Sequence, residues 1–245
     1  MKHLLIVGRP GVGKTTLIKR LVESLRSRPI DGFLTEEYRE GEQRVGFWLS
    51  PLDGRQMLLA HRTMAAGIRI GAYTVNPSVL EEVAIPVIQR AAAHALILFL
   101  DELGSMELCA PAFERAVVHA FDHGPSIVAT ASLAPLPLLQ TLKRRRDVEL
   151  IPLTPTNREV VHEELAARLD ALCAEDESVR TLQRKAERIC EMIASIETAP
   201  IDIEIQQAAL REAIRQAFPE QQTLYQLLYE SRFRRLWQQF RSDSS

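Results

Sequence analysis

Cysteine is scarce in this sequence, and long apolar runs are missing from it. The 245 residues include 3 Cys, at positions 109, 173 and 190, with no Cys or His spacing typical of a metal site. This odd, scattered set excludes a disulfide framework and a zinc module, and it favours a reducing, cytoplasmic location. No stretch approaches the roughly 18 apolar residues that span a bilayer. The apolar run at residues 4–7 is also shorter than the core of a signal peptide, so we expect no membrane partner.

The sequence also lacks a marked excess of positive or negative charge. Lys and Arg total 30 and Asp and Glu total 32, for a net charge of -2, so the chain lacks the basic excess of a dedicated nucleic-acid binder. Nucleic-acid binding stays open but is not indicated. With 25% charged and 46% hydrophobic residues, the composition is that of a folded protein. The length suits one ordinary domain with an appendage.

Apolar runs alternate with helical patterns through the first two thirds of the chain. Short strands rich in apolar residues are predicted at 4–7, 96–100, 126–130 and 148–153, and the first is fully apolar. Helices are predicted at residues 14–27, 77–93 and 111–123, and a hairpin-like region at 30–57. Apolar strands that alternate with helices form parallel sheets that are covered on both faces. We therefore expect an α/β fold with a mostly parallel sheet.

The remaining residues have a different character, because Glu, Arg, Gln and Ala dominate after about residue 157. A short strand candidate remains at 201–205, and a further helix is expected over about 205–240. Apolar residues recur at alternating spacings of three and four at Val179, Leu182, Ala186, Ile189, Ile193 and Ile196. This seam either pairs two chains into a homo-oligomer or packs on its own core. We predict two domains, residues 1–174 and a helical extension at 175–245.

The sequence GRPGVGKTT at residues 8–16 contains the pattern G-x-x-x-x-G-K-T, with a predicted strand before it and a helix after it. Gly11 and Gly13 allow successive backbone N–H groups to turn toward an anion. The helix N-terminus adds a partial positive charge, and Lys14 would reach the terminal phosphates. The nucleotide-binding residues predicted here are Gly8, Arg9, Pro10, Gly11, Val12, Gly13, Lys14, Thr15 and Thr16.

A second acidic element follows the predicted strand at 96–100. Asp101 and Glu102 come directly after it, and ligands bind at the carboxyl ends of strands in open α/β sheets. Thr15 and Asp101 are the candidate ligands of Mg²⁺, the expected cofactor. Glu102 is the candidate base or water-orienting group.

Phosphoryl transfer also needs a cation beside the developing charge on the phosphoryl oxygens. The candidate is a residue of the run Lys-Arg-Arg-Arg at 143–146, and the charge pattern does not indicate which of the four it is. Asn157 and Arg158 follow the last predicted strand and could border the base. They do not form the guanine-reading pattern Asn-Lys-x-Asp, because Arg158 replaces Lys and Val160 stands in place of Asp. We expect no strict guanine preference.

Several landmarks in order resemble the small THEP-type nucleoside-triphosphatases. They cover about residues 3–165 and comprise GRPGVGKTTL, GFLTEEYRE, the stretch at 71–76, DELGSMEL at 101–108 and RRRDVELIPLTPTNRE at 144–159. The resemblance implies a RecA-like P-loop core, Mg²⁺-dependent hydrolysis of nucleoside triphosphates and broad base tolerance. It also matches Arg145 to a family arginine, so the expected catalytic residues are Lys14, Glu102 and Arg145.

Two positions depart from the family pattern. Ser105 stands where the family commonly has a lysine, and Ala72 stands where a Lys or Arg is common. A cationic role at the first position is therefore lost or has moved, with the run at 143–146 as one destination. The extension after about residue 175 has no counterpart in the compact family members.

Three functions remain open at this stage. The first is an enzyme that hydrolyses ATP, GTP and other nucleoside triphosphates to the diphosphate and phosphate. The second is a phosphotransferase that acts on a nucleoside, a nucleic-acid end or a small metabolite, with the region at 30–76 as acceptor site or lid. The third is a nucleotide-dependent regulatory module with the helical extension as its output surface.

Overall fold

The computed structural model describes residues 3–195, 197–221 and 223–241. The chain divides into two compact units, Met1–Asp170 and Ala171–Ser245. Helix α6, Arg158–Ala194, begins in the first unit and ends in the second. Among the described residues, no helix combines the length and apolar character that crossing a membrane requires.

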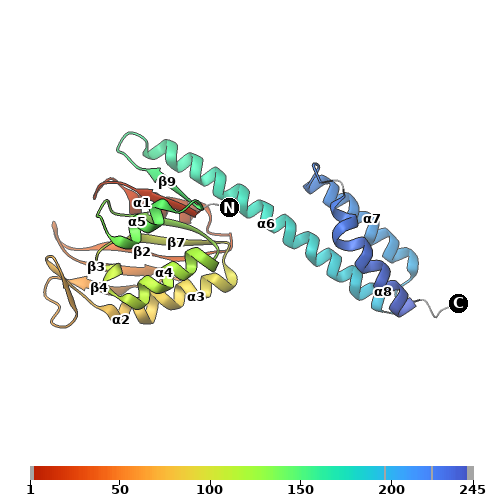
Figure 1. Cartoon of the computed structure of the whole chain (residues 1–245), viewed down its shortest axis with the longest axis horizontal. Helices are drawn as coiled ribbons and strands as arrows, with labels where there is room; N and C mark the ends of the chain where they lie inside the picture. The colour runs from red at the N-terminus through yellow and green to blue at the C-terminus, as the bar shows by residue number, and fades with distance from the viewer. Residues whose placement is uncertain (1–2, 196, 222, 242–245) are drawn as a thin grey trace. The chain divides into compact units, whose positions relative to one another are not determined.

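A single sheet of the described residues organises the first unit (Figure 1). Its strands are β1 His3–Val7, β2 Ile30–Glu40, β3 Gln43–Pro51, β4 Met57–His61, β5 Ile68–Ile70, β6 Tyr73–Val75, β7 Ile97–Leu103, β8 Ser126–Ala131 and β9 Val148–Pro152. Their order across the sheet is β5-β6-β4-β3-β2-β7-β8-β1-β9.

The half of the sheet from β2 to β9 is parallel, as predicted from the apolar runs. Strand β1 pairs with β8 on one side and β9 on the other, and β7 pairs with β8 and β2, all in parallel. The carboxyl ends of these strands therefore share one edge. Strand β8 lies between β1 and β7, so the glycine-rich loop and the acidic pair are separated by one strand.

The other half of the sheet is an antiparallel extension formed by β3 to β6. Strands β2 and β3 form the long hairpin that the sequence predicts, and Gly41 in its turn has a φ of 59°, which favours glycine. Strand β4 pairs with β3 and β6, and β5 closes the edge. The structure adds these three short strands to the predicted fold.

The helices of the first unit cover the sheet on both faces. They are α1 Lys14–Ser24, α2 Pro77–Val79, α3 Ile85–His94, α4 Pro111–His123 and α5 Pro137–Arg144, followed by the start of α6. The predicted helix at 77–93 is α2 and α3 joined by a π-helical turn, Leu80–Ala84, and the side chain of Asn76 caps its start. Helices α3, α4 and α5 bury their apolar sides with Leu5, Leu98 and Ile127 of the sheet. Neighbouring strand residues such as Leu4 and Phe99 point to the opposite face.

The second unit is built from the end of α6, α7 Pro200–Ala217 and α8 Ser231–Arg241, with a π-helical segment, Gln226–Glu230, before α8. The predicted seam packs on its own core, which contains Leu182, Ala186, Ile189, Ile193, Ile203, Leu210, Ile214, Tyr225 and Phe233. Ile196, the last seam residue, lies outside the described residues.

The strand expected at 201–205 is wrong, because these residues open α7. Pro200 occupies the first turn of the helix, where a missing N–H costs nothing. Ile203 is buried, whereas Ile201 and Ile205 are 60% and 55% exposed. Alternating isoleucines resemble a strand, but burial of Ile203, Leu210 and Ile214 follows helical spacing.

The aromatic and arginine-rich stretch at 233–240 docks on this unit. Phe233 is buried in the core and Trp237 packs against it. Arg241 donates to the carbonyl oxygens of Ile193, Thr198 and Met192 at 2.8–2.9 Å. The contacts with Ile193 and Met192 satisfy carbonyl groups at the end of α6 that have no helical partner, and the contact with Thr198 holds the segment that follows.

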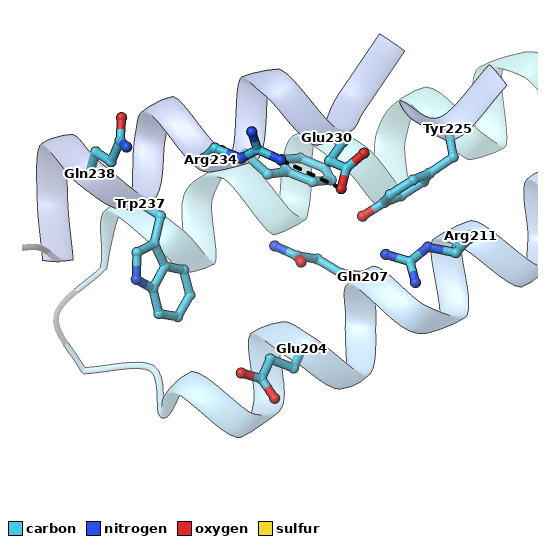
Figure 2. Close-up of a pocket in the computed structure, with 9 residues that line it drawn as sticks. Glu204, Gln207, Arg211, Tyr225, Glu230, Arg234, Trp237 and Gln238 are labelled. Carbon is cyan, nitrogen blue, oxygen red and sulfur yellow. Dashed lines mark ion pairs between the residues drawn. The ribbon is translucent and has the colours of Figure 1, made fainter. Parts of the chain in front are cut away.

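A pocket of about 430 Å³ opens between α7 and α8 (Figure 2). Gln207 and Arg211 reach it from α7, and Arg234 and Trp237 reach it from α8. The guanidinium of Arg211 lies 4.7 Å from the centre of the Tyr225 ring, a cation–π contact. The pocket is thus lined by aromatic rings and by charges of both signs.

Candidate active site

The glycine-rich loop connects β1 to α1 and has the backbone that an anion site needs. Gly11 and Gly13 have φ values of 75° and 98°, and Gly13 is the residue that precedes the first turn of α1. The first amides of the helix have no helical partner, so they remain available to phosphate oxygens. A Cβ atom on Gly8 would lie 2.8 Å from the Leu153 carbonyl oxygen, so only glycine lets the loop pass β9 this closely.

Lys14 lies along this loop. Its side chain is buried, and Nζ donates to the carbonyl oxygen of Gly8 at 3.3 Å and of Arg9 at 3.5 Å. Arg9, Pro10, Gly11 and Thr16 form the exposed rim of the loop, whereas Val12 is buried beneath it. The lysine ammonium is thus placed inside the curve of the loop, where it would meet a phosphate group.

Asp101 is completely buried at the carboxyl end of β7. Its Oδ1 accepts from Thr130 Oγ1 at 2.8 Å, and its Oδ2 accepts from the backbone N–H of Thr35 at 3.4 Å. The side chain of Thr15, from the glycine-rich loop, lies close enough to the carboxylate to lower its pKa. Burial raises the pKa of Asp101 to about 6, although Thr130 and Thr15 counteract the shift. The structure therefore brings together the two residues predicted to hold a metal ion.

Glu102 has an unusual backbone. Its φ of 67° is the single positive value at a non-glycine position among the described residues. A left-handed conformation costs a residue with a side chain about 1–2 kcal/mol. The backbone N–H of Glu102 donates to Thr130 Oγ1 at 2.8 Å, which holds the residue in this conformation. Strain of this kind concentrates at functional sites.

Beside Glu102 lies a pocket of about 390 Å³, bordered by Thr35 of β2, by the ends of β7 and β8 and by the antiparallel extension. Glu107 lies at its base and is buried, with Oε2 accepting from the Gly104 N–H at 3.1 Å. Burial, followed by the charge of Glu102, raises the pKa of Glu107 to about 8. Ala72 and Ser105, the two positions that depart from the family pattern, both line this pocket.

The loop after β9 lies beside the glycine-rich loop. Asn157 Oδ1 accepts from the Thr154 N–H at 2.8 Å, and its Nδ2 donates to the Pro152 carbonyl oxygen at 2.9 Å. The side chain of Asn157 thus shapes the loop that was expected to border the base. Arg158 Nη1 lies 3.5 Å from the place where a Gly13 Cβ would be, so its guanidinium reaches the start of α1.

Arg145 does not lie near the glycine-rich loop, and this corrects the expected catalytic role. Its guanidinium donates to Asp147 at 2.7 and 2.9 Å, to Asp122 at 2.5 Å and to the Phe121 carbonyl oxygen at 3.0 Å. These bonds raise the pKa of Arg145. The His3 N–H donates to the Asp147 carbonyl oxygen, which places Arg145 at the amino end of β1. The loop lies at the carboxyl end, roughly 13 Å further along the strand.

The whole run at 143–146 shares this displacement. It ends α5 and precedes β9, and residues that precede a parallel strand lie at the edge opposite to the ligand site. The hydrogen bonds of Arg145 join α4 to the start of β9. Arg158, which follows β9, is the arginine that reaches the loop.

A profile of the family described as NTPase matches residues 3–166. The chain belongs to this NTPase family. Nucleoside-triphosphatase THEP1 of Thermotoga maritima is 39% identical over 166 residues, which cover 68% of this chain and 94% of that protein. The cancer-related nucleoside-triphosphatase of Homo sapiens is 34% identical over 172 residues, which cover 64% and 90% of the two chains.

Solved structures of the NTPase family have the same fold. The crystal structure of THEP1 from Aquifex aeolicus superposes with a TM-score of 0.61 at 36% identity, over 66% of this chain and 96% of that one. The solution structure of the human cancer-related nucleoside triphosphatase gives 0.62 at 32% identity, over 70% and 98%. The expected family and the P-loop NTPase fold are confirmed, and the protein is an NTPase enzyme. Residues 167–245 lie beyond the family match.

The sequence analysis did not identify two residues of this site. Thr130 hydrogen-bonds the side chain of Asp101 and the backbone of Glu102. The sequence feature that could have identified it is a hydroxyl residue at the carboxyl end of an apolar strand. Glu107 was part of the DELGSMEL landmark, where a lone acid stands between Met106 and Leu108. An acid in an apolar segment predicts burial, but only the fold places it beside Glu102.

Proposed function

We propose that this protein hydrolyses ATP, GTP and other nucleoside triphosphates to the diphosphate and phosphate, with Mg²⁺ and with broad base tolerance. One observation carries the proposal: the Thr15 side chain of the glycine-rich loop lies close enough to the buried carboxylate of Asp101 to lower its pKa. A hydroxyl beside a carboxylate is the oxygen donor set that suits Mg²⁺ bound to a nucleotide. The names of the relatives support the same reaction class.

Each group of the loop then has a defined task. The amides at 8–16 bind the phosphate oxygens, and Lys14 balances the charge on the terminal phosphates. Thr15 and Asp101 would hold the magnesium ion, which supplies charge neutralisation when it is bound. Glu102, next in sequence to Asp101, orients the attacking water and accepts its proton.

Arg158 takes the part that was expected of Arg145. Its guanidinium lies against Gly13, at the start of α1, where it can contact a bound nucleotide. Arg9 lies on the exposed rim of the same loop and is the other cation that belongs to the site. An arginine at this position stabilises negative charge through directed hydrogen bonds.

Broad base tolerance follows from the loop after β9. Both polar atoms of the Asn157 side chain bond the backbone of their own loop, at Thr154 and Pro152. A side chain that is used in this way is a poor reader of a base edge. Discrimination between bases needs dedicated hydrogen bonds, which this residue does not offer.

We further propose that residues 1–174 form the NTPase domain and that residues 175–245 form a separate helical extension. None of the described cysteines, Cys109, Cys173 and Cys190, forms a disulfide bond, which supports a location in the reducing cytoplasm. Leu227 and Leu228 of the extension are 76% and 53% exposed, which favours a second role for it as an output surface or as the contact of a homo-oligomer.

Release of phosphate from the full-length protein tests the proposed function. ATP, GTP, CTP and UTP are supplied with and without Mg²⁺, and we expect turnover of all four with it. Lys14→Ala should abolish nucleotide binding, whereas Glu102→Gln should bind nucleotide and lose turnover. Full activity of Glu102→Gln would remove this residue from the mechanism, and absence of turnover with every nucleotide would contradict the proposal.

A further inference from the structure

The pocket beside Glu102 is larger than a single water needs. Its volume of about 390 Å³ falls within the range of small-molecule sites, about 300–1,000 Å³. Glu102, Ser105 and Ser132 line one side, and Phe47 and residues 70–73 of the antiparallel extension line the other. The extension is remote from the glycine-rich loop in the sheet order, so nucleotide binding does not require this wall.

Glu102 lies between this pocket and the phosphate site. Thr15 lies beside the carboxylate of Asp101, and Glu102, which follows Asp101 in the chain, lines the pocket. The left-handed backbone of Glu102 and its bond to Thr130 hold this residue between the two spaces. A molecule in the pocket is therefore adjacent to the group that orients the attacking nucleophile.

The charges of the pocket select an uncharged occupant. Among the described residues that line it, none is Lys or Arg, and the charged side chains are carboxylic acids. Arg44 and Arg62 lie near but do not line the pocket. The Nε of Arg44 donates to the Tyr73 hydroxyl at 3.1 Å and its Nη1 pairs with Glu37, and the Arg62 guanidinium lies 5.6 Å from the centre of the Tyr73 ring. A phosphate-bearing ligand needs free cations, which this pocket does not offer. Hydroxyl groups suit Glu102, Ser105 and Ser132, and the edges of Phe47 and Tyr73 suit an apolar ring or chain.

We propose that this pocket binds a neutral small molecule that carries hydroxyl groups, and that one hydroxyl receives the γ-phosphoryl group. The inference rests on the proposed nucleotide site. The hydroxyl oxygen bonds to the γ-phosphorus, and the bond from that phosphorus to the bridging oxygen breaks, with its electron pair leaving on the nucleoside diphosphate. Glu102 accepts the hydroxyl proton and releases it to solvent. The products are a phosphomonoester and the diphosphate, whereas water in the same place gives inorganic phosphate.

The test measures where the phosphoryl group goes. The full-length protein is incubated with Mg²⁺ and ATP labelled in the γ-phosphoryl group, together with glycerol, adenosine or cytidine in separate reactions. With at least one of these probes, ADP should exceed inorganic phosphate, the difference should appear as a labelled phosphomonoester, and its formation should saturate with the probe.

Two variants test whether the transfer depends on the pocket. Ala72→Trp fills the pocket from the exposed turn before β6, and Ala65→Trp places the same side chain on an exposed position outside the pocket. Ala72→Trp should hydrolyse ATP within about twofold of the unmodified protein and lose about tenfold or more of the transfer. Ala65→Trp should retain both activities. If Ala72→Trp does not fold, Ser105→Trp replaces it in the test, because it fills the pocket from the side of Glu102.

Three outcomes would overturn the inference in different ways. Equal amounts of ADP and inorganic phosphate with all three probes would leave the NTPase in place and remove the acceptor. Transfer that Ala72→Trp does not reduce would place the acceptor elsewhere. Absence of ADP in every reaction would contradict the proposed function itself, and the acceptor with it.

Discussion

Thr130 and Asp101 are joined by a buried hydrogen bond of 2.8 Å, in which the threonine hydroxyl donates to Oδ1. The same oxygen of Thr130 accepts from the backbone N–H of Glu102 at 2.8 Å. One hydroxyl on β8 therefore orients the carboxylate expected to hold the metal and the backbone of the residue expected to orient water. Because β8 lies between β1 and β7, this residue connects the two halves of the site.

Thr130→Val removes the hydroxyl and keeps the shape of the side chain. Asp101 then loses a bond that lowers its pKa, so the variant should need more Mg²⁺ for half-maximal turnover, and kcat should fall about tenfold. Thr130→Ser, which keeps the hydroxyl, should behave like the unmodified protein. Steady-state hydrolysis at varied Mg²⁺ measures both effects. Identical Mg²⁺ requirements for the Val and Ser variants would show that the bond has no role in the site.

Arg158→Ala and Arg145→Ala separate the two arginine roles. Arg158 reaches the glycine-rich loop, so its removal should raise KM for ATP about tenfold, and Arg158→Lys should restore part of the loss. Arg145 joins Asp122 and Asp147 at the far edge of the sheet, so its removal should lower the melting temperature and leave KM within about twofold. A large KM effect of Arg145→Ala with a normal melting temperature would reverse this assignment.

The raised pKa of Glu107 predicts how the free energy of unfolding depends on pH. Burial raises its pKa from 4.5 to about 8 in the folded protein, so the folded state keeps a proton that the unfolded chain releases. The free energy of unfolding should therefore fall as pH rises through this window. Glu107→Gln keeps an acceptor for the Gly104 N–H and removes the titration, so its stability should fall less between pH 5 and pH 8. Urea unfolding at several pH values measures both curves, and parallel curves would contradict the prediction.

Truncation after residue 174 tests the independence of the extension. The family match ends at residue 166, and the alignments cover 94% of the Thermotoga maritima relative and 90% of the human one, so the part before the extension contains nearly a whole family member. The 1–174 protein should fold and keep ATP turnover within about twofold. Size-exclusion chromatography of both forms then shows whether an oligomer is lost with the extension. Unfolding of the shortened protein would mean that the extension is part of the core.

The phosphate loop and the acidic pair were predictable because their chemistry is local. A loop that binds phosphate needs Gly11, Gly13 and Lys14 at fixed spacing, and an acid after an apolar strand falls at the ligand edge of a parallel sheet. Arg145 shows where local reasoning failed. The run at 143–146 precedes β9, and the direction of a parallel strand places residues before it at the opposite edge. This rule favours Arg158 over Arg145 and could have been applied to the sequence.

The strand predicted at residues 201–205 was wrong for a different reason. Alternating Ile201, Ile203 and Ile205 satisfy the period of a strand, and only the burial of Ile203 against α6 and α8 decides for a helix. Tertiary packing overrides a pattern this short, because three residues carry too little apolar surface to select one period.

The sequence by itself determined the family and the P-loop fold, and it proposed Lys14, Thr15, Asp101 and Glu102 as site residues, since these features depend on residue type and spacing along a strand and a helix. Only the tertiary structure decided which partners they meet: Thr130 between the two acids, Arg158 in place of Arg145, and the pocket between Glu102 and the antiparallel extension. The physical reason is that strand order brings together residues that are distant in sequence, and no local pattern specifies which strands become neighbours.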